Sequence, residues 1–489
     1  MSHAITTITQ AQKAIAQGQI TPSELVQKAL DTIEKTDKTL HANITVCHER
    51  ALAKAKEFDA LVGTASAADK PLLGIPLSVK DVFCTQGILT TAASKMLNNF
   101  IPPYSAHIVQ KLEDAGAILV AKTNMDEFAM GASTEFSSFA NTTNPWNSEC
   151  VPGGSSGGSA ASVAAGQVLA SIGTDSGGSI RQPAALCGCV GLKPTYGRVS
   201  RHGTIAYASS FDQAGPMASC VEDCGVLFDI IAGYDEKDPT SSLHPMSSFA
   251  ESAQRSDLSG VTIGLPKELW SLDLSPEVRA VSEKAIEIPR QAGAKTVDVS
   301  LPHLAYSVAS YYILTTAEAS TNMARYDGVR FGLRVEDEDD DLTTMYTKSR
   351  TAGFGEEVKR RILLGTYVLS AGYYDSYYKK AAQIRRLVHD DFLASLTQCD
   401  ILMAPVTSRT AWKFGTFADA PLEAYKMDLL TLGANLAGIP GLSLPAGLGQ
   451  ESGLPVGVQL LGKHFDENAL LRIGQVLESH LPGLGRPAL

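Results

Sequence analysis

The sequence predicts an α/β protein with a central sheet, built as one large domain. Three observations favour this fold. Short apolar runs typical of buried strands alternate with segments of helical periodicity along much of the chain. The 489 residues contain no internal repeat and no Pro/Ser-rich linker that would separate two halves. Hydrophobic residues make up 44% of the chain and charged residues 19%, which is the composition of a globular protein.

The first 65 or so residues are expected to form a helical segment. Thr21 is a candidate N-cap, Pro22 occupies the first helical position and Glu24 the third, which together make a capping box. Apolar residues then recur at helical spacing, at Leu25, Ala29, Leu30 and Ile33. The pattern therefore predicts an amphipathic helix that begins at Pro22.

A core is expected between about residues 70 and 220. Residues 72–79 form a short apolar run typical of a strand, which ends at Lys80. Helical spacing over residues 108–115 comes before a second buried strand at 116–121. Beyond residue 260, strand and helix patterns alternate again, at 261–265, 277–292 and 296–299.

The charge balance limits the classes of function. Lys and Arg number 41 against 52 Asp and Glu, so the formal net charge is -11. A protein whose main function is to bind nucleic acid needs a cationic surface, so the charge argues against this class. It does not exclude a subunit that meets nucleic acid through a partner. The one acidic block, residues 336–341, is typical of a solvated loop.

Composition also bears on location and metal content. No apolar run reaches the roughly 18–20 residues that a membrane-spanning helix needs, and the first residues show no secretory signal pattern. The eight cysteines are scattered, which is typical of reduced thiols in a cytoplasmic protein. The pairs Cys187/Cys189 and Cys220/Cys224 match no zinc-site spacing, so we expect no metal site.

Two motifs resemble catalytic signatures but lack their structural context. Residues 457–463 resemble a phosphate-binding loop, yet His464 follows where Ser or Thr is required, and the interior is apolar like a strand. Residues 153–157 match the GxSxG nucleophile pattern, yet Pro152 precedes them and no apolar strand leads into them. Neither motif is expected to work in that form.

Two Gly/Ser-rich segments are the strongest candidates for chemistry. They cover residues 151–160 and 171–183, and a flexible linker is the alternative interpretation. Both segments abut apolar helix and strand patterns, which argues against a linker, and glycines in such places let the backbone approach a ligand closely. Residues 176–179 can form a nest of N–H donors suited to an oxyanion.

A serine nucleophile in these segments needs a base, and Lys80 is the candidate. A lysine at the end of an apolar run is otherwise a surface group whose ammonium reaches water. To act as a base near pH 7, its pKa must fall by roughly 3 units from about 10.4, at a cost of about 4–5 kcal/mol that full burial can impose. A histidine base, at His202, His303 or His464, is the alternative.

Together these residues resemble the amidase signature family. The matching motifs occur in the family's order, at residues 74–81, 152–159, 173–184, 188–195 and 212–216. The resemblance implies a single domain over residues 1–489, with a central mixed β-sheet sandwiched between helices.

The resemblance also implies a Ser-cisSer-Lys triad. Lys80 is then the base, Ser155 the bridging serine with a cis peptide bond, and Ser179 the nucleophile that forms an acyl-enzyme. Backbone N–H groups are expected to form the oxyanion hole, at Ser176, Gly177 and Gly178.

Further stretches look like one branch of the family, the A subunits of glutamyl-tRNA(Gln)/aspartyl-tRNA(Asn) amidotransferases. They are residues 324–332, 354–367 and 370–378, and the departures are slight: Ser176 where Thr is common, and Phe211 where Leu is common. The resemblance implies an enzyme that hydrolyses glutamine and passes ammonia to partner subunits B and C. These partners would amidate a misacylated tRNA with ATP and magnesium, so no cofactor is expected in this chain.

The same resemblance implies five substrate-binding residues, namely Met130, Gly131, Tyr312, Arg361 and Asp428. Glutamine carries both charges at its α-carbon, so a specific pocket needs a cation for the carboxylate and an anion for the ammonium. Arg361 and Asp428 would supply them. Arg360 is the fallback for Arg361, and the sequence cannot separate Tyr311 from Tyr312.

Two other functions stay open at this point. A free-standing amidase for small carboxamides would use the same triad, although the Arg- and Tyr-rich segment 354–378 argues against it. A non-catalytic assembly component with a relic site would not need an intact triad. The sequence also leaves open whether the tRNA carries Glu, Asp or either.

Overall fold

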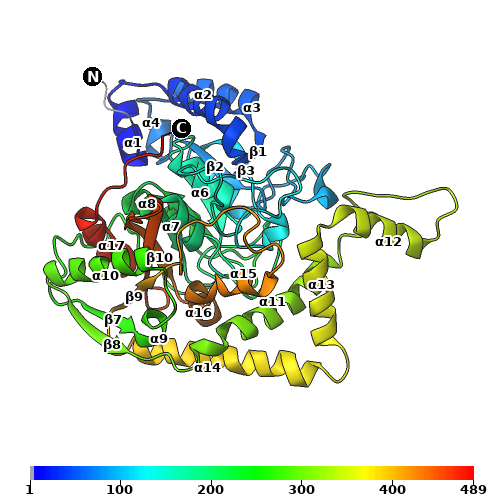
Figure 1. Ribbon diagram of the computed structural model, residues 1–489. Coiled ribbons are helices and arrows are strands. Elements are labelled where there is room, and N and C mark those ends of the chain that lie inside the picture. Colours follow the sequence, from blue (N-terminus) through cyan, green and yellow to red (C-terminus); the bar gives the residue numbers. More distant parts are fainter. Residues whose placement is uncertain (1–4, 489) are drawn as a thin grey trace.

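An eleven-stranded sheet runs through the centre of the computed structural model, which describes residues 5–488 (Figure 1). The strand order is β1-β3-β2-β4-β6-β5-β10-β11-β9-β7-β8. The strands are β1 (Asn43–Val46), β2 (Pro76–Lys80), β3 (Ile118–Thr123), β4 (Ala170–Thr174), β5 (Val190–Lys193), β6 (Ala214–Ala218), β7 (Thr262–Pro266), β8 (Lys295–Val299), β9 (Ile401–Pro405), β10 (Gly441–Leu448) and β11 (Pro455–Leu461). Strands from the two halves of the chain meet where β5 pairs with β10.

The sheet is mixed, as the family resemblance implies. Strand β2 runs parallel to β3 and β4, and β7 runs parallel to β8 and β9. The pairs between β4 and β11 in the strand order are antiparallel. Parallel neighbours need crossover connections, and helices α5 (His107–Asp114) and α6 (Gly157–Ala164) lie in the two crossovers from β2 to β3 and from β3 to β4.

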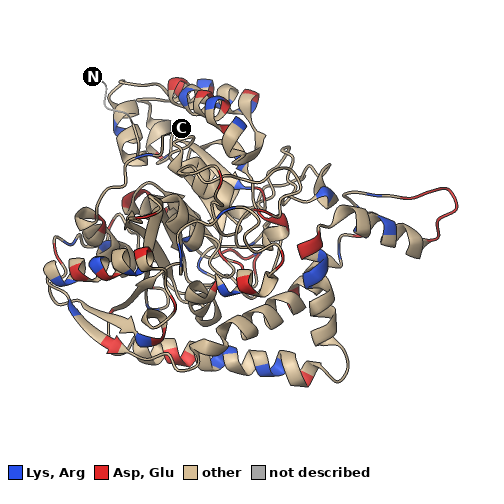
Figure 2. Ribbon diagram, in the orientation of Figure 1, with Lys and Arg blue, Asp and Glu red and all other residues tan. Residues whose placement is uncertain are grey.

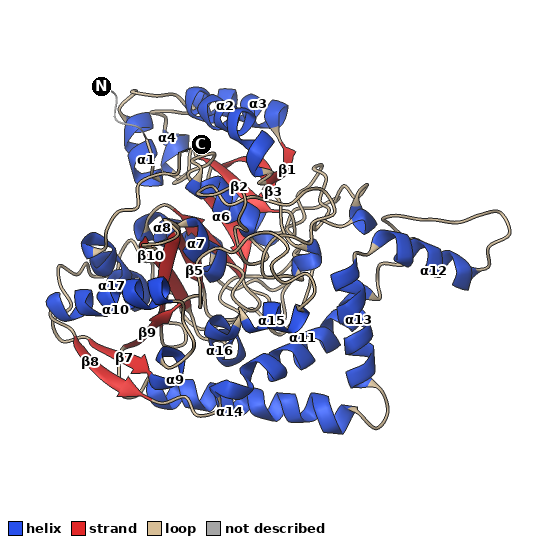
Figure 3. Ribbon diagram, in the orientation of Figure 1, coloured by secondary structure: helices blue, strands red, loops and turns tan. Residues whose placement is uncertain are grey.

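Helices cover both faces of the sheet (Figure 3). One group packs around a shared apolar cluster, made by α2 (Pro22–Leu40), α3 (His48–Asp59), α6 and α7 (Arg181–Cys187). A second group packs on the opposite face, made by α8 (Val221–Ile231), α10 (Pro276–Gln291) and α17 (Glu467–His480). Short helices complete the body, namely α1 (Ile8–Ala16), α4 (Ala65–Ala68), α9 (Lys267–Trp270) and α15 (Pro421–Lys426). The expected sheet between two helical layers is confirmed.

Four further helices pack along one side of the body, and one of them, α12 (Leu342–Gly353), projects from it (Figure 1). The others are α11 (Ser307–Met323), α13 (Glu356–Leu369) and α14 (Lys380–Ser395). Helix α11 packs against α13 and α14, and both α11 and α14 pack against α16 (Leu429–Ala437). Charged residues are frequent along outer helices such as α2, α10 and α14 (Figure 2).

Several local predictions are confirmed. The Thr21 hydroxyl accepts the Glu24 N–H and the Glu24 carboxylate accepts the Thr21 N–H, so a capping box opens α2. The apolar run that ends at Lys80 is β2, and the phosphate-loop-like motif is mostly the buried strand β11. The acidic block 336–341 is a largely exposed loop before α12.

The remaining expectations concern membranes, metals and boundaries. Within residues 5–488, no helix is both long and apolar enough to cross a membrane. The same part of the chain holds no group of three or more His, Cys, Asp or Glu side chains that could bind a metal ion, and the eight cysteines are free thiols. The boundaries of the N-terminal helical segment and of the core stay predictions.

Candidate active site

Lys80 lies at the carboxyl end of β2 and is completely buried. Its Nζ donates to three hydroxyls, with Ser155 Oγ at 2.7 Å, Thr174 Oγ1 at 2.8 Å and Ser156 Oγ at 2.9 Å. Desolvation lowers the pKa of Lys80 from 10.5 to about 7 and outweighs the opposing effect of nearby aspartates. The side chain therefore has the burial that a neutral lysine base requires.

Ser155 stands in the loop before α6, and its Oγ accepts the hydrogen bond from Lys80. The resemblance implies a cis peptide bond at this serine, and the structure differs, since the peptide bonds of residues 5–488 are all trans. The trans form is favoured by about 2.5–4 kcal/mol when the residue is not proline. The contact between Ser155 and Lys80 forms in the trans conformation.

Ser179 lies in the turn between β4 and α7 and retains 9% of its exposed area, whereas Lys80 and Ser155 retain none. A Cβ atom placed on Gly154 would lie 3.0 Å from Ser179 Cα, so the loops that carry the two serines are in direct contact. The structure thus brings the three predicted triad residues into one region, in which only Ser179 reaches accessible space.

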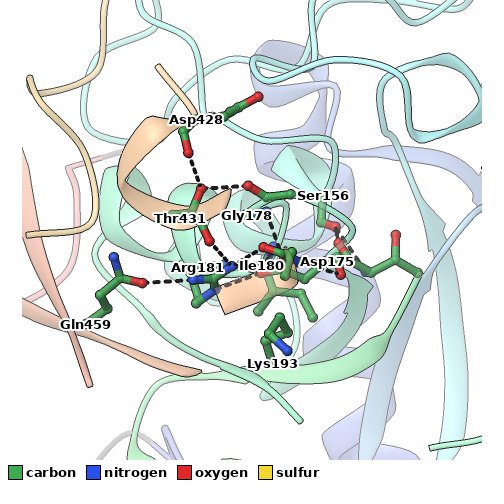
Figure 4. Close-up of polar contacts among 12 residues, drawn as sticks. Ser156, Asp175, Gly178, Ile180, Arg181, Lys193, Asp428, Thr431 and Gln459 are labelled. Carbon is green, nitrogen blue, oxygen red and sulfur yellow. Dashed lines mark hydrogen bonds and ion pairs between the residues drawn. The ribbon is translucent and has the colours of Figure 1, made fainter. Parts of the chain in front are cut away.

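A buried ion pair holds the loop that carries Ser179 (Figure 4). Asp175 Oδ2 accepts from Arg181 Nε at 3.0 Å. Arg181 also donates to Gln459 Oε1 at 2.8 Å and to Asn435 Oδ1 at 2.6 Å. Burial alone would raise the pKa of Asp175, but Arg181 outweighs it and lowers the pKa to about 2. The ionised pair ties this loop to β11 and α16.

The backbone donors of this loop differ from expectation at one position. The Gly178 N–H donates to Asp175 Oδ1 at 2.8 Å and is therefore already engaged. Within residues 5–488, the N–H groups of Ser176, Gly177 and Ser179 have no hydrogen-bond acceptor. These three donors, rather than Gly178, are available to an oxyanion.

A pocket of about 160 Å³ contains three of the predicted substrate-binding residues, Gly131, Tyr312 and Arg361. Aromatic rings line much of the rest, from Phe136, Trp412, Phe417 and Tyr425. Met130 is fully buried next to Gly131 and does not line the pocket. Asp428 does not line the pocket itself, but it accepts a hydrogen bond at 2.8 Å, from the OH of Tyr312 to Oδ2.

The two neighbouring arginines of α13 differ in burial and in their contacts. Arg361 is only 3% exposed, and it donates from Nε to Glu357 Oε1 at 2.8 Å and from Nη1 to the Tyr207 OH at 2.7 Å. Arg360 also contacts Glu357, but 44% of its side chain is exposed. Arg361 is therefore the inner cation of the pocket and Arg360 the outer one.

The two neighbouring tyrosines of α11 also have different surroundings. Tyr312 lines the pocket and stacks on Tyr425, with ring centroids 4.0 Å apart. Tyr311 lies against the Ser179 loop instead, because a Cβ atom on Gly177 would be 2.6 Å from its OH. Tyr312 is thus the one of the two tyrosines that lines the pocket.

Asp428 is the buried acid beside the pocket. Besides the Tyr312 OH, it accepts from Gln182 Nε2 at 3.3 Å. Burial raises the pKa of Asp428 to about 7. An ammonium group bound here would stabilise the carboxylate, because a nearby opposite charge favours the ionised form.

The segment that leads into the pocket has a strained backbone. In residues 126–136, which form this segment, Phe128, Ala129 and Thr134 have positive φ, and so do Ala92 and Ala93 of a loop hydrogen-bonded to it. Asp126 holds part of this segment by accepting the N–H groups of Thr134 and Phe136. A Cβ atom on Gly131 would lie 2.3 Å from the Asp126 carboxyl carbon, which explains the glycine there. Strain of this kind clusters at functional sites.

Sequence reasoning missed several residues that shape the site. The hydroxyls of Ser156 and Thr174 accept hydrogen bonds from Lys80, as Ser155 does. Glu357 and Tyr207 accept hydrogen bonds from Arg361. Glu357 precedes Arg361 by one helical turn, so the i, i+4 spacing was a usable signal. No sequence signal marks Tyr207, which reaches the arginine only through the fold.

The alternative histidine bases lie elsewhere. His303 Nδ1 contacts Asp391 Oδ1 at 3.0 Å, and His464 Nε2 contacts a backbone carbonyl at 3.0 Å. His202 packs against an aromatic ring, and none of the three histidines hydrogen-bonds to Ser179. Lys80 is therefore the base that the geometry supports.

Comparison with known sequences gives a consistent result. A family model described as Amidase matches residues 24–471. The chain is 54% identical to the A subunit of the glutamyl-tRNA(Gln) amidotransferase of Nitratidesulfovibrio vulgaris, over 97% of this chain and 96% of that protein. It is also 54% identical to the protein of the same name in Lawsonia intracellularis, over 95% of each chain.

Solved structures agree with the sequences. The A subunit of the glutamyl-tRNA(Gln) amidotransferase from Thermotoga maritima, known from a crystal structure, is 40% identical, with a TM-score of 0.80 over 97% of this chain and 95% of that one. The native peptide amidase from Stenotrophomonas maltophilia is 31% identical, with a TM-score of 0.83 over 98% of each chain. With a matching family model and relatives of this identity along nearly its whole length, the chain belongs to the amidase family.

Proposed function

We propose that this chain is the glutaminase component, the A subunit, of a tRNA-dependent amidotransferase that converts Glu-tRNA(Gln) to Gln-tRNA(Gln). Relatives that are 50–54% identical carry that name. The observation that carries the proposal is a buried cation and a buried acid, Arg361 and Asp428, grouped around Tyr312 beside the Ser179 loop. A free-standing amidase for uncharged carboxamides has no need of such a pair and is not favoured.

The triad supports acyl transfer through Ser179. Neutral Lys80 takes a proton from Ser155 Oγ, which takes one from Ser179 Oγ as that oxygen attacks the carboxamide carbon. The N–H groups of Gly177 and Ser179 stabilise the oxyanion. The proton then returns through Ser155 to the leaving nitrogen, the C–N bond breaks and ammonia departs. Water cleaves the γ-glutamyl ester by the same relay and releases glutamate.

The charged groups of the pocket account for glutamine specificity. Among residues 5–488, Arg361 Nη2 has no hydrogen-bond acceptor beside the Nε contact with Glu357 and the Nη1 contact with Tyr207, so it can bind the α-carboxylate. Asp428 binds the α-ammonium with the help of the Tyr312 OH. Each charge-assisted bond of this kind contributes about 1.5–3 kcal/mol.

Ammonia is used outside this chain in our proposal. It passes to partner subunits B and C, which amidate the misacylated tRNA with ATP and magnesium in the cytoplasm. The net charge of -11 supports this division, because an acidic chain is poorly suited to hold tRNA by itself. Asp-tRNA(Asn) is a second substrate for the same assembly to be tested. No cofactor is assigned to this chain.

One experiment tests the proposal directly. The chain is purified alone and with subunits B and C, and glutamine hydrolysis is measured with and without Glu-tRNA(Gln), ATP and magnesium. We expect weak glutamine hydrolysis by the isolated chain. The rate should rise in the assembly supplied with Glu-tRNA(Gln), ATP and magnesium, which should yield Gln-tRNA(Gln). Full-rate hydrolysis of assorted aliphatic amides by the isolated chain, with no response to partners, would instead identify a free-standing amidase.

A further inference from the structure

One peptide unit of the nucleophile loop, between Gly177 and Gly178, is held from both sides. The Gly177 carbonyl accepts from Thr431 Oγ1 at 2.6 Å, and the Gly178 N–H donates to Asp175 Oδ1 at 2.8 Å. Thr431 and Asp175 are both fully buried. Because the C=O and N–H of a trans peptide point in opposite directions, the two bonds together fix the rotation of this peptide plane.

The plane needs such support because it lies between two glycines. Glycine gives the backbone more freedom than any other residue, and Gly178 has a φ of 135°. Thr431 in turn requires the glycine, since a Cβ atom on Gly178 would lie 2.2 Å from its Oγ1. The threonine hydroxyl and the glycine pair are therefore matched to each other across two distant segments.

The neighbouring peptide units carry the donors that the mechanism uses. The N–H groups of Gly177 and Ser179 flank the clamped plane and have no acceptor within residues 5–488. The direction in which each N–H points depends on the rotation of the plane between them. A fixed plane therefore aims both donors at one place before substrate arrives, which is what makes an oxyanion hole effective.

We infer that Thr431 is a positioning residue for the oxyanion hole, and that it couples this hole to Asp428, the acid proposed to bind the substrate. The Thr431 N–H donates to the Asp428 carbonyl at 2.9 Å in the first turn of α16. Thr431 Oγ1 also lies 2.9 Å from that carbonyl, and the shorter contact for its single proton is the 2.6 Å one to Gly177. The first turn of α16 thus carries both Asp428, proposed to bind the ammonium, and Thr431, which holds the peptide between Gly177 and Gly178. The coupling to glutamine rests on the proposed function, whereas the clamp itself does not.

The test compares Thr431→Val, which removes the hydroxyl, with Thr431→Ser, which keeps it, in the full-length chain assembled with its partners. Thr431→Val is expected to lower kcat for glutamine by about 10- to 100-fold while KM changes less than about 3-fold. Thr431→Ser should restore most of the rate. The midpoint of the pH profile should stay unchanged in both variants, because Lys80 is not touched.

The matched control is Thr142→Val. Thr142 is also fully buried, and its Oγ1 donates to the backbone carbonyl of a distant residue, His41, at 2.9 Å. Removing this hydroxyl is expected to cost stability without a change in kcat. A loss of kcat in Thr142→Val equal to that in Thr431→Val would show that the effect is general destabilisation and would overturn the inference.

A second substrate separates this inference from the proposed function. By the proposed mechanism, hydrolysis of p-nitrophenyl acetate would also acylate Ser179 and need the oxyanion hole, but this ester has no α-amino acid group. If wild type fails on glutamine yet Thr431→Val is slowed on the ester, the proposed function fails and the clamp stands. If Thr431→Val keeps its rate on both substrates, or Thr431→Ser falls as far, the clamp is wrong. Should Thr431→Val not fold, Thr431→Ala against Thr431→Ser makes the same comparison.

Discussion

Lys80 Nζ and Ser155 Oγ lie 2.7 Å apart, in a site where every hydrogen-bond acceptor of the lysine is a hydroxyl. In residues 5–488, no carboxylate pairs with this lysine. The nearby Asp126 accepts backbone N–H groups instead, and Asp212 accepts the Ser176 hydroxyl at 2.6 Å. A direct carboxylate partner would keep a buried lysine charged. Because no carboxylate contacts Lys80 directly, desolvation lowers the pKa of this lysine to about 7.

The triad can be tested by separating glutamine use from ammonia use. Ser179→Ala should abolish glutamine-dependent amidation in the assembled complex, and Lys80→Ala should come close, because the nucleophile or its base is missing. Amidation with added ammonium chloride should survive in both variants. His303→Ala is the control and should keep the wild-type rate. A Lys80→Ala variant with a near wild-type glutaminase rate would refute the base assignment.

The pKa of Lys80 predicts the acidic limb of the rate profile. The lysine must be neutral to take a proton, so kcat/KM should rise with pH and level off above about pH 7. Asp428, whose pKa is also about 7, must be ionised to bind an ammonium, so glutamine should show a steeper limb than p-nitrophenyl acetate. Initial rates from about pH 5.5 to about pH 9 check this. Equal slopes for both substrates would exclude a role for Asp428.

The same burial predicts a cost in stability. Lys80 has a pKa of 10.5 in the unfolded chain and about 7 in the fold, so the penalty is complete below pH 7 and is relieved as the pH rises from 7 to 10.5. Lys80→Met should therefore raise the free energy of unfolding by roughly 1–3 kcal/mol at about pH 6, since hydroxyls left without their donor offset part of the gain. The gain should shrink at about pH 9. Denaturant titrations at the two pH values measure it, and a gain that grows with pH would contradict the assignment.

The pocket cation offers a paired test on one helix. Arg361→Ala should lower kcat/KM for glutamine by roughly 10²-fold or more, because the α-carboxylate of the bound glutamine loses its charge-assisted hydrogen bonds. Arg360→Ala, which removes the exposed neighbour, should have little effect. The rate of p-nitrophenyl acetate hydrolysis should stay near wild type in both variants. If Arg361→Ala leaves the KM for glutamine unchanged, the α-carboxylate binds elsewhere.

Local elements were predictable where one physical pattern dominates. The helix expected at 277–292 is α10, and the strands expected at 261–265 and 296–299 are β7 and β8, each within about one residue. The strand expected at 116–121 is β3, which runs two residues further. Its end was missed because Lys122 looks like a surface residue. The fold buries it instead against Asp81, with Nζ and Oδ1 3.1 Å apart.

Strand order and side-chain surroundings were not predictable in this way. Periodicity says which face of a strand is buried but not which strand lies beside it, so the pairing of β5 with β10 had no local signal. Adjacent residues of a helix point in different directions, yet only the packing of α11 and α13 decides that Tyr312 and Arg361 face the pocket. The three residues proposed as a triad were located through their motifs. The engagement of the Gly178 N–H by Asp175 depends on loop conformation, which those motifs do not encode.

The strand order has a consequence for how the chain is made. Strands β10 and β11 lie between β5 and β9, and Gln459 of β11 is a partner of Arg181. A nascent chain on the ribosome that has exposed Ser179 still lacks these strands, so β5 stays an open edge and the loop has no C-terminal support. Translation must pass Leu461, the end of β11, before this support for the serine loop is in place. We therefore expect a chain truncated before β11 to leave the Ser179 loop without the contact between Arg181 and Gln459 that supports it.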